Sequence, residues 1–62
     1  MTTPLATIET AAEMLAVHPR TIRRYISSGD LPAYRIGARQ IRVRTSDVDA
    51  LLVPIPTAGG RL

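Results

Sequence analysis

The sequence predicts a small α+β domain, mostly α-helical, in which a helix, a tight turn and a second helix precede a β-hairpin and a third helix. Apolar residues recur at helical spacing on both sides of the break 17–19, and Pro19 stands where a new helix would begin. Two runs that alternate apolar and arginine residues flank a loop containing Gly37, which predicts the hairpin. At 62 residues the chain holds one domain, near the lower size limit for a core without disulfides or metals.

The first helix is predicted to run from residue 8 to about Ala16. Thr7 is placed to cap it, and Glu9 in the first turn suits the helix dipole. Pro19 disfavours helix for the residue before it and is favoured at the first helical position, so a second helix should begin there. Four apolar residues spaced i, i+3, i+4 and i+7 form the inner stripe of the first helix: Ile8, Ala11, Ala12 and Leu15.

The second helix is predicted over residues 19–28, and Gly29 is a natural residue to end it. One side is apolar and the other is cationic. Arginines on one helix face with no acid between them repel each other, an arrangement most easily tolerated where the face meets an anion. The first backbone N–H groups of this helix could also hold a phosphate. The apolar side carries Ile22, Tyr25 and Ile26, and the cationic side carries Arg20, Arg23, Arg24 and Ser27.

The hairpin is predicted from residues 33–36 and 40–43, joined by 37–39 with Arg39 at the tip. The alternation predicts one buried and one solvent-exposed face. Arg44 could instead pair with Asp47 or Asp49, and is left out of the candidate site. The expected buried face holds Ile36, Ile41 and Val43, and the expected exposed face holds Arg35, Arg42 and Arg44.

A third helix should be capped by Ser46, with Asp47 and Asp49 in its first turn, and should end at Pro54. Its inward residues are expected to be Val48, Leu51 and Leu52. Residues 53–62, with two prolines and two glycines, show no regular pattern. The chain therefore divides into a winged helix-turn-helix domain over residues 1–52 and a C-terminal tail over 53–62.

Composition excludes several classes of function. Without cysteine and with one histidine, the chain lacks the usual ligands of a metal site, and it has no apolar run or leader typical of a membrane or secreted protein. We therefore expect a cytoplasmic protein with no cofactor, no metal and no enzymatic activity. Tyr25 and Tyr34 are expected to pack at the edge of the core, and the lack of Phe and Trp disfavours a single-stranded nucleic acid target.

The positive charge is concentrated in the middle of the chain. Residues 20–44 hold seven of the eight arginines and one acid, whereas residues 1–19 hold two acids and no arginine. Such a block predicts a polyanionic partner, and guanidinium groups suit both phosphate and guanine. Two alternatives stay open: a solvated charged face, and a GC-rich coding bias that would also favour Arg over Lys.

Three runs of the sequence carry a family resemblance: residues 8–22 (IETAAEMLAVHPRTI), 27–37 (SSGDLPAYRIG) and 41–51 (IRVRTSDVDAL). In these runs, and without gaps over about residues 6–52, the chain resembles the small excisionase-type DNA-binding domains of the MerR-like winged-helix group. Two positions depart from the family pattern, since His18 replaces a common serine cap and Arg23 replaces a common aromatic residue. His18 is expected to cap the second helix or contact a phosphate.

The resemblance implies a second helix in the DNA major groove and a hairpin tip over the adjacent minor groove. The residues expected in the major groove or on its walls are Arg20, Thr21, Arg23 and Arg24, with Arg20 and Thr21 the better candidates for base edges. Arg39 is expected to probe the minor groove, and Arg35 and Arg42 to clamp phosphates. For Arg35 and Arg42 the alternative is a solvated or salt-bridged strand face.

A phage excisionase is the function this resemblance implies: a protein that binds attachment-site DNA cooperatively, bends it and directs integrase toward excision. The alternatives are a small phage or plasmid transcription regulator, and a protein-interaction adaptor. Expected partners are double-stranded DNA, a phage integrase and neighbouring copies in head-to-tail association, with no membrane. The tail is a candidate for contact with integrase or a second copy, and the expected location is the nucleoid of a bacterial host.

Overall fold

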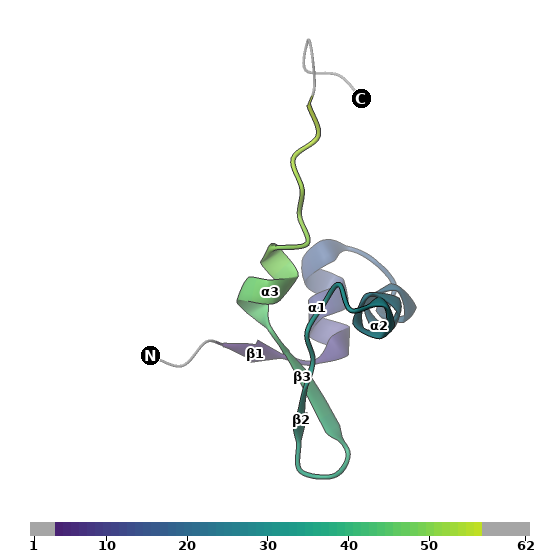
Figure 1. Cartoon of the computed structure of the whole chain (residues 1–62), viewed down its shortest axis with the longest axis vertical. Helices are drawn as coiled ribbons and strands as arrows, with labels where there is room; N and C mark the ends of the chain where they lie inside the picture. The colour runs from purple at the N-terminus through teal and green to yellow at the C-terminus, as the bar shows by residue number, and fades with distance from the viewer. Residues whose placement is uncertain (1–3, 57–62) are drawn as a thin grey trace.

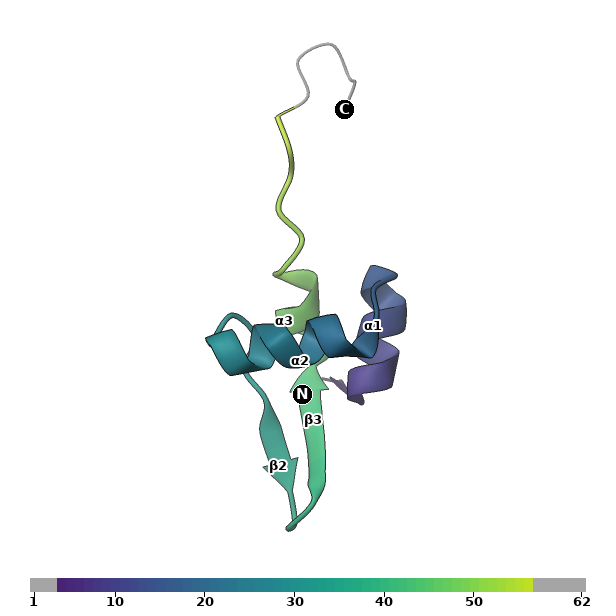
Figure 2. The ribbon, with the colours of Figure 1, turned by 90° about the vertical axis from the view of Figure 1, so that its right-hand side faces the viewer.

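The computed structural model describes residues 4–56 and contains three helices and three strands in that part of the chain (Figure 1). In chain order the elements are β1 (Leu5–Ala6), α1 (Ile8–Leu15), α2 (Pro19–Ser28), β2 (Tyr34–Ile36), β3 (Gln40–Arg44) and α3 (Thr45–Asp49). The winged helix-turn-helix order is confirmed, with strand β1 as an addition that the sequence did not predict. The β2–β3 hairpin and residues 53–56 extend toward opposite ends of the molecule (Figures 1 and 2).

Helix α1 begins and ends where its capping residues predict. The hydroxyl oxygen of Thr7 accepts a hydrogen bond of 3.0 Å from the Thr10 N–H, which confirms the predicted cap. Ala16 ends the helix in the left-handed region at φ 56°, the one non-glycine residue with positive φ in residues 4–56. A left-handed alanine is strained by about 1–2 kcal/mol, and it reverses the chain toward α2 within the short break.

Helix α2 is capped by a histidine side chain. The Nδ1 atom of His18 accepts a hydrogen bond of 3.0 Å from the Arg20 N–H, so the expected capping role is confirmed. At the other end Gly29 adopts φ 86°, a conformation that glycine reaches without Cβ strain. The Tyr25 carbonyl then accepts from the N–H of Asp30 and of Leu31, at 2.9 and 3.1 Å, which brings Leu31 back into the core.

The three strands form an antiparallel sheet in the order β1-β3-β2. The predicted division of the hairpin into faces is wrong, because Ile36 pairs with Gln40 and Arg35 pairs with Ile41. Directly opposed residues share a face. A loop of three residues, 37–39, therefore puts Ile36 on the face of Arg42 and puts Arg35 on the face of Ile41 and Val43. Of the three apolar residues expected on one buried face, Val43 alone is buried.

The predicted start of the third helix is also wrong. Helix α3 begins at Thr45 with Arg44 in the capping position, no side chain caps it, and Ser46 lies inside its first turn. A tertiary contact fixes this start, because the Thr45 N–H donates to the Pro4 carbonyl at 3.0 Å, next to the pair that Leu5 of β1 forms with Arg44 of β3. The helix ends at Asp49, and turns carry the chain on to Leu52, so Pro54 does not end it.

The core lies where α1, α2, α3 and the inner ends of β1 and β3 meet. Tyr25 packs against it as expected, and so does Leu51, but Leu52 is 63% exposed rather than packed inward. Tyr34 does not lie at the edge of the core, because its side chain is exposed. The sequence allows Arg44 to pair with Asp47 or Asp49, but in the structure its guanidinium carbon lies over the Tyr34 ring, 4.6 Å from the ring centroid. The buried residues are Ala6, Ala11, Ala12, Ile22, Leu31, Val43 and Val48.

Residues 53–56 are exposed and belong to no helix or strand, while residues 57–62 of the predicted tail lie outside the described part of the chain. No helix in the described residues has both the length and the apolar character that crossing a membrane requires.

Candidate nucleic-acid interface

The exposed face of α2 is cationic, as its helical spacing predicts. Arg20, Arg23 and Arg24 are exposed, Thr21 is half-buried, and Ile22 on the inner side is 0% exposed. The first turn of α2 contains no acidic residue that could neutralise these arginines. Ile22 anchors the helix in the core, so the three guanidinium groups are presented on a fixed support.

The backbone at the start of α2 is already occupied. The Arg20 N–H donates to the His18 side chain, the Thr21 N–H donates to the His18 carbonyl at 2.9 Å, and Pro19 has no N–H. These N–H groups would have to exchange their His18 partners to hold a phosphate, and that role stays a prediction.

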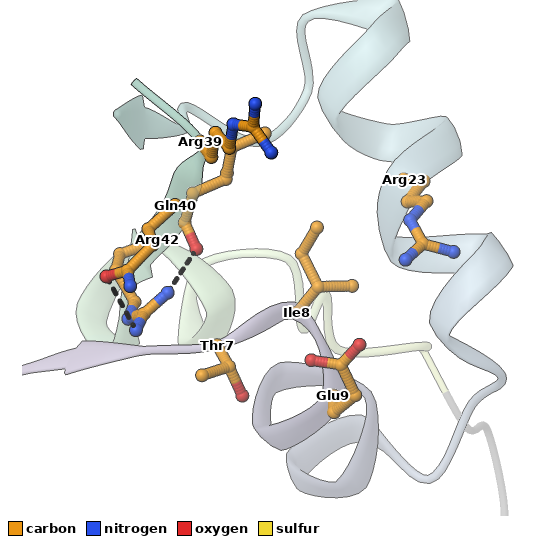
Figure 3. Close-up of a pocket in the computed structure, with 8 residues that line it drawn as sticks. Thr7, Ile8, Glu9, Arg23, Arg39, Gln40 and Arg42 are labelled. Atoms are coloured by element: carbon orange, nitrogen blue, oxygen red, sulfur yellow. Dashed lines mark hydrogen bonds between the residues drawn. The ribbon is translucent and has the colours of Figure 1, made fainter. Parts of the chain in front are cut away.

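The hairpin presents its arginines in two different ways. Arg39 is exposed at the end of the loop 37–39, where Gly37 adopts φ 65° and allows the tight turn. Arg35 is exposed on β2. Arg42 is half-buried, and its guanidinium donates to the Ile41 carbonyl at 3.0 Å and to Gln40 Oε1 at 3.5 Å (Figure 3). Arg42 is thus held against its own strand.

A groove separates α2 from the hairpin and brings together three of the seven candidate residues, Arg23, Arg39 and Arg42 (Figure 3). Arg20, Thr21, Arg24 and Arg35 do not line it. The remaining walls come from the start of α1 and from β3, with Thr7, Ile8, Glu9, Gln40 and Ile41.

Sequence reasoning did not place the start of α1 in this groove. Its position follows from β1, whose pairing with β3 brings residue 7 beside the hairpin. A strand of two residues leaves almost no periodic signal in a sequence, so nothing in the pattern indicated that Glu9 would share a groove with Arg23.

Metal chemistry has no visible support in this surface. Within residues 4–56, no group of three or more His, Cys, Asp or Glu side chains could hold a metal ion.

Comparison with known proteins finds a matching family and a similar phage protein. Residues 7–52 match the sequence profile of a family described as a helix-turn-helix domain. The chain is also 48% identical over 50 residues to an excisionase of Mycobacterium phage D29, and that alignment covers 81% of this chain and 89% of the phage protein. The profile spans both α2 and the hairpin, and so includes all seven candidate residues.

Proposed function

This chain belongs to the helix-turn-helix domain family and, within it, to the phage excisionases, and on that premise we propose how it binds DNA. Helix α2 enters the major groove with its arginine face, and the hairpin reaches the adjacent minor groove. The observation that carries this proposal is the arrangement of Arg20, Arg23 and Arg24 on one exposed face, fixed from behind by buried Ile22.

The seven candidate residues then divide among four tasks. Arg20 and Thr21, near the start of α2, contact base edges, and Arg24 lies against the groove wall. Arg39 at the hairpin tip enters the minor groove, which attracts arginine most strongly where A·T-rich sequence narrows it. Arg23, Arg35 and Arg42 contact phosphates. Arg42 would first exchange its bond to Gln40 for one to the phosphate, since that bond is long at 3.5 Å.

A single copy of this domain should bind weakly. About four to six phosphate contacts, each adding roughly −0.9 to the salt slope, would make binding strongly dependent on ionic strength. Useful occupancy then requires several copies side by side on attachment-site DNA, in the cytoplasm and nucleoid of the host. Contacts between copies, or with integrase, would use the exposed apolar side chains after α3, which are Leu52, Val53 and Ile55.

A gel-shift titration tests this function on an attachment-site fragment, a promoter-like fragment and a scrambled fragment, all of equal length. We expect a ladder of cooperative, salt-sensitive shifts on the attachment site and weak, non-cooperative binding to the scrambled DNA. One discrete shift, confined to a promoter-like fragment, would instead indicate a transcription regulator. No shift on any fragment at low salt would contradict DNA binding and favour an adaptor that contacts other proteins.

Removing residues 53–62 tests the proposed contact between neighbouring copies. We expect a chain that stops after Leu52 to keep its affinity for one isolated site, because its core and all seven candidate DNA-binding residues remain. On DNA with several sites, its cooperativity should fall about tenfold, the equivalent of about 1.4 kcal/mol for each lost contact. The comparison is made by gel shift on one-site and multi-site fragments, and unchanged cooperativity would disprove a role for this segment between copies.

A further inference from the structure

One carboxylate lies among the arginines of the groove. Glu9 is exposed in the first turn of α1, and it lines the same groove as Arg23, Arg39 and Arg42. Figure 3 shows its side chain extending toward Arg23, with no hydrogen bond drawn between the two. The cap of α1 does not depend on this carboxylate, because Thr7 already accepts from the Thr10 N–H.

The proposed binding mode places a DNA strand in this groove. The major and minor grooves of a duplex are separated by a sugar-phosphate backbone. If α2 lies in one groove and the hairpin tip lies in the next, the intervening strand has to cross between α2 and β3. The phosphates of that strand would then be attracted by Arg23, Arg39 and Arg42 and repelled by Glu9.

We propose that Glu9 is a built-in restraint on DNA affinity, acting by like-charge repulsion of the phosphate that crosses the groove. The inference rests on the proposed function and deepens it. A phosphate is present in every sequence, so the restraint lowers the affinity of a lone copy for any duplex. Neighbouring copies gain contacts that a lone copy lacks, so arrays on adjacent sites remain occupied while isolated non-specific sites stay empty.

The test compares two charge-neutralising variants of the same helix. Glu9→Gln removes the carboxylate in the groove, and Glu13→Gln removes an exposed carboxylate one turn later that does not line it. Both variants change the net charge equally. A third variant, Glu9→Asp, keeps a negatively charged carboxylate at residue 9.

Binding is measured by fluorescence anisotropy on a scrambled duplex of about 20 base pairs, at about 50 mM and about 300 mM salt. We expect Glu9→Gln to bind about 3- to 10-fold more tightly than the wild type at low salt, with a smaller gain at high salt as screening weakens the repulsion. Glu13→Gln and Glu9→Asp should stay within about twofold of the wild type. Far-ultraviolet circular dichroism verifies that each variant is folded.

Four results would overturn the restraint. Equal gains for Glu9→Gln and Glu13→Gln would show that net charge alone sets the affinity, and weaker binding by Glu9→Gln would show that Glu9 positions Arg23 for contact. If the wild type binds the duplex and Glu9→Gln binds it with the same affinity, the restraint is wrong and the proposed function stands. A wild-type chain that binds no duplex at either salt concentration would contradict the proposed function, and the restraint with it.

Discussion

Replacing Arg20 and Arg24 together with alanine should lower the affinity for attachment-site DNA by about a hundredfold or more. An arginine that contacts a base or phosphate contributes about 1–3 kcal/mol, and the two are on separate turns of α2. The loss should be accompanied by a shallower salt dependence, with the slope falling by about 1 for each phosphate contact removed. Fluorescence anisotropy at several salt concentrations measures both quantities.

The same double variant should remain folded. Both side chains are exposed, and alanine has a higher helix propensity than arginine. The double substitution also removes the repulsion between two like charges four residues apart. The His18 cap accepts from the backbone N–H of residue 20, which alanine retains. Thermal unfolding should therefore change little, which separates a binding defect from a folding defect.

Arg44→Ala is the matched control for this prediction. It removes the same charge per substitution, but Arg44 lies over the Tyr34 ring, outside the proposed binding residues. Its effect on DNA affinity should be limited to the general loss of one positive charge. If Arg44→Ala lowers the DNA affinity as much per arginine as the α2 double variant does, then the arginines act through net charge and not through their placement on α2.

The helix-turn-helix half of the fold was predictable because its signals are local. The caps of α1 and α2, the break at Pro19 and the end at Gly29 each depend on side chains within four residues, and all four are present in the structure. For the same reason the arginine face of α2 could be read directly from the helical period. The roles of those arginines on DNA stay predictions.

The sheet and its neighbourhood were less predictable because they depend on long-range pairing. Strand β1 exists through its register with β3, in which Leu5 pairs with Arg44. The same pairing region sets the start of α3, which overrides Ser46 as a plausible local cap. The loop 37–39 was predicted correctly, but the hairpin faces were misassigned because alternation within each strand does not say which residues stand opposite each other. The observed pairing of Ile36 with Gln40 puts Ile36 on the face of Arg42.

Core packing yields the second large prediction, which concerns Ile22. Ile22→Ala should destabilise the chain by about 2–5 kcal/mol, since removing a large buried side chain loses its transfer free energy and leaves a cavity. Ile22 is 0% exposed, and three of the other six core residues are alanines, which have no side-chain length with which to fill the space. A domain of this size is stable by only about 3–5 kcal/mol, so much of the variant should be unfolded.

Urea unfolding followed by circular dichroism measures this effect, with Ile36→Ala as the control. Ile36 is 44% exposed on the hairpin, so its replacement should change the free energy of unfolding by less than about 1 kcal/mol.

Because DNA binds the folded chain, adding duplex at about 100 times Kd should raise the free energy of unfolding of Ile22→Ala by about 2.7 kcal/mol. The Arg20→Ala/Arg24→Ala variant should gain far less from the same DNA, since its defect lies in the contact itself. An Ile22→Ala chain as stable as the wild type would show that α2 is not anchored through this side chain, and the rigid support proposed for its arginines would be lost.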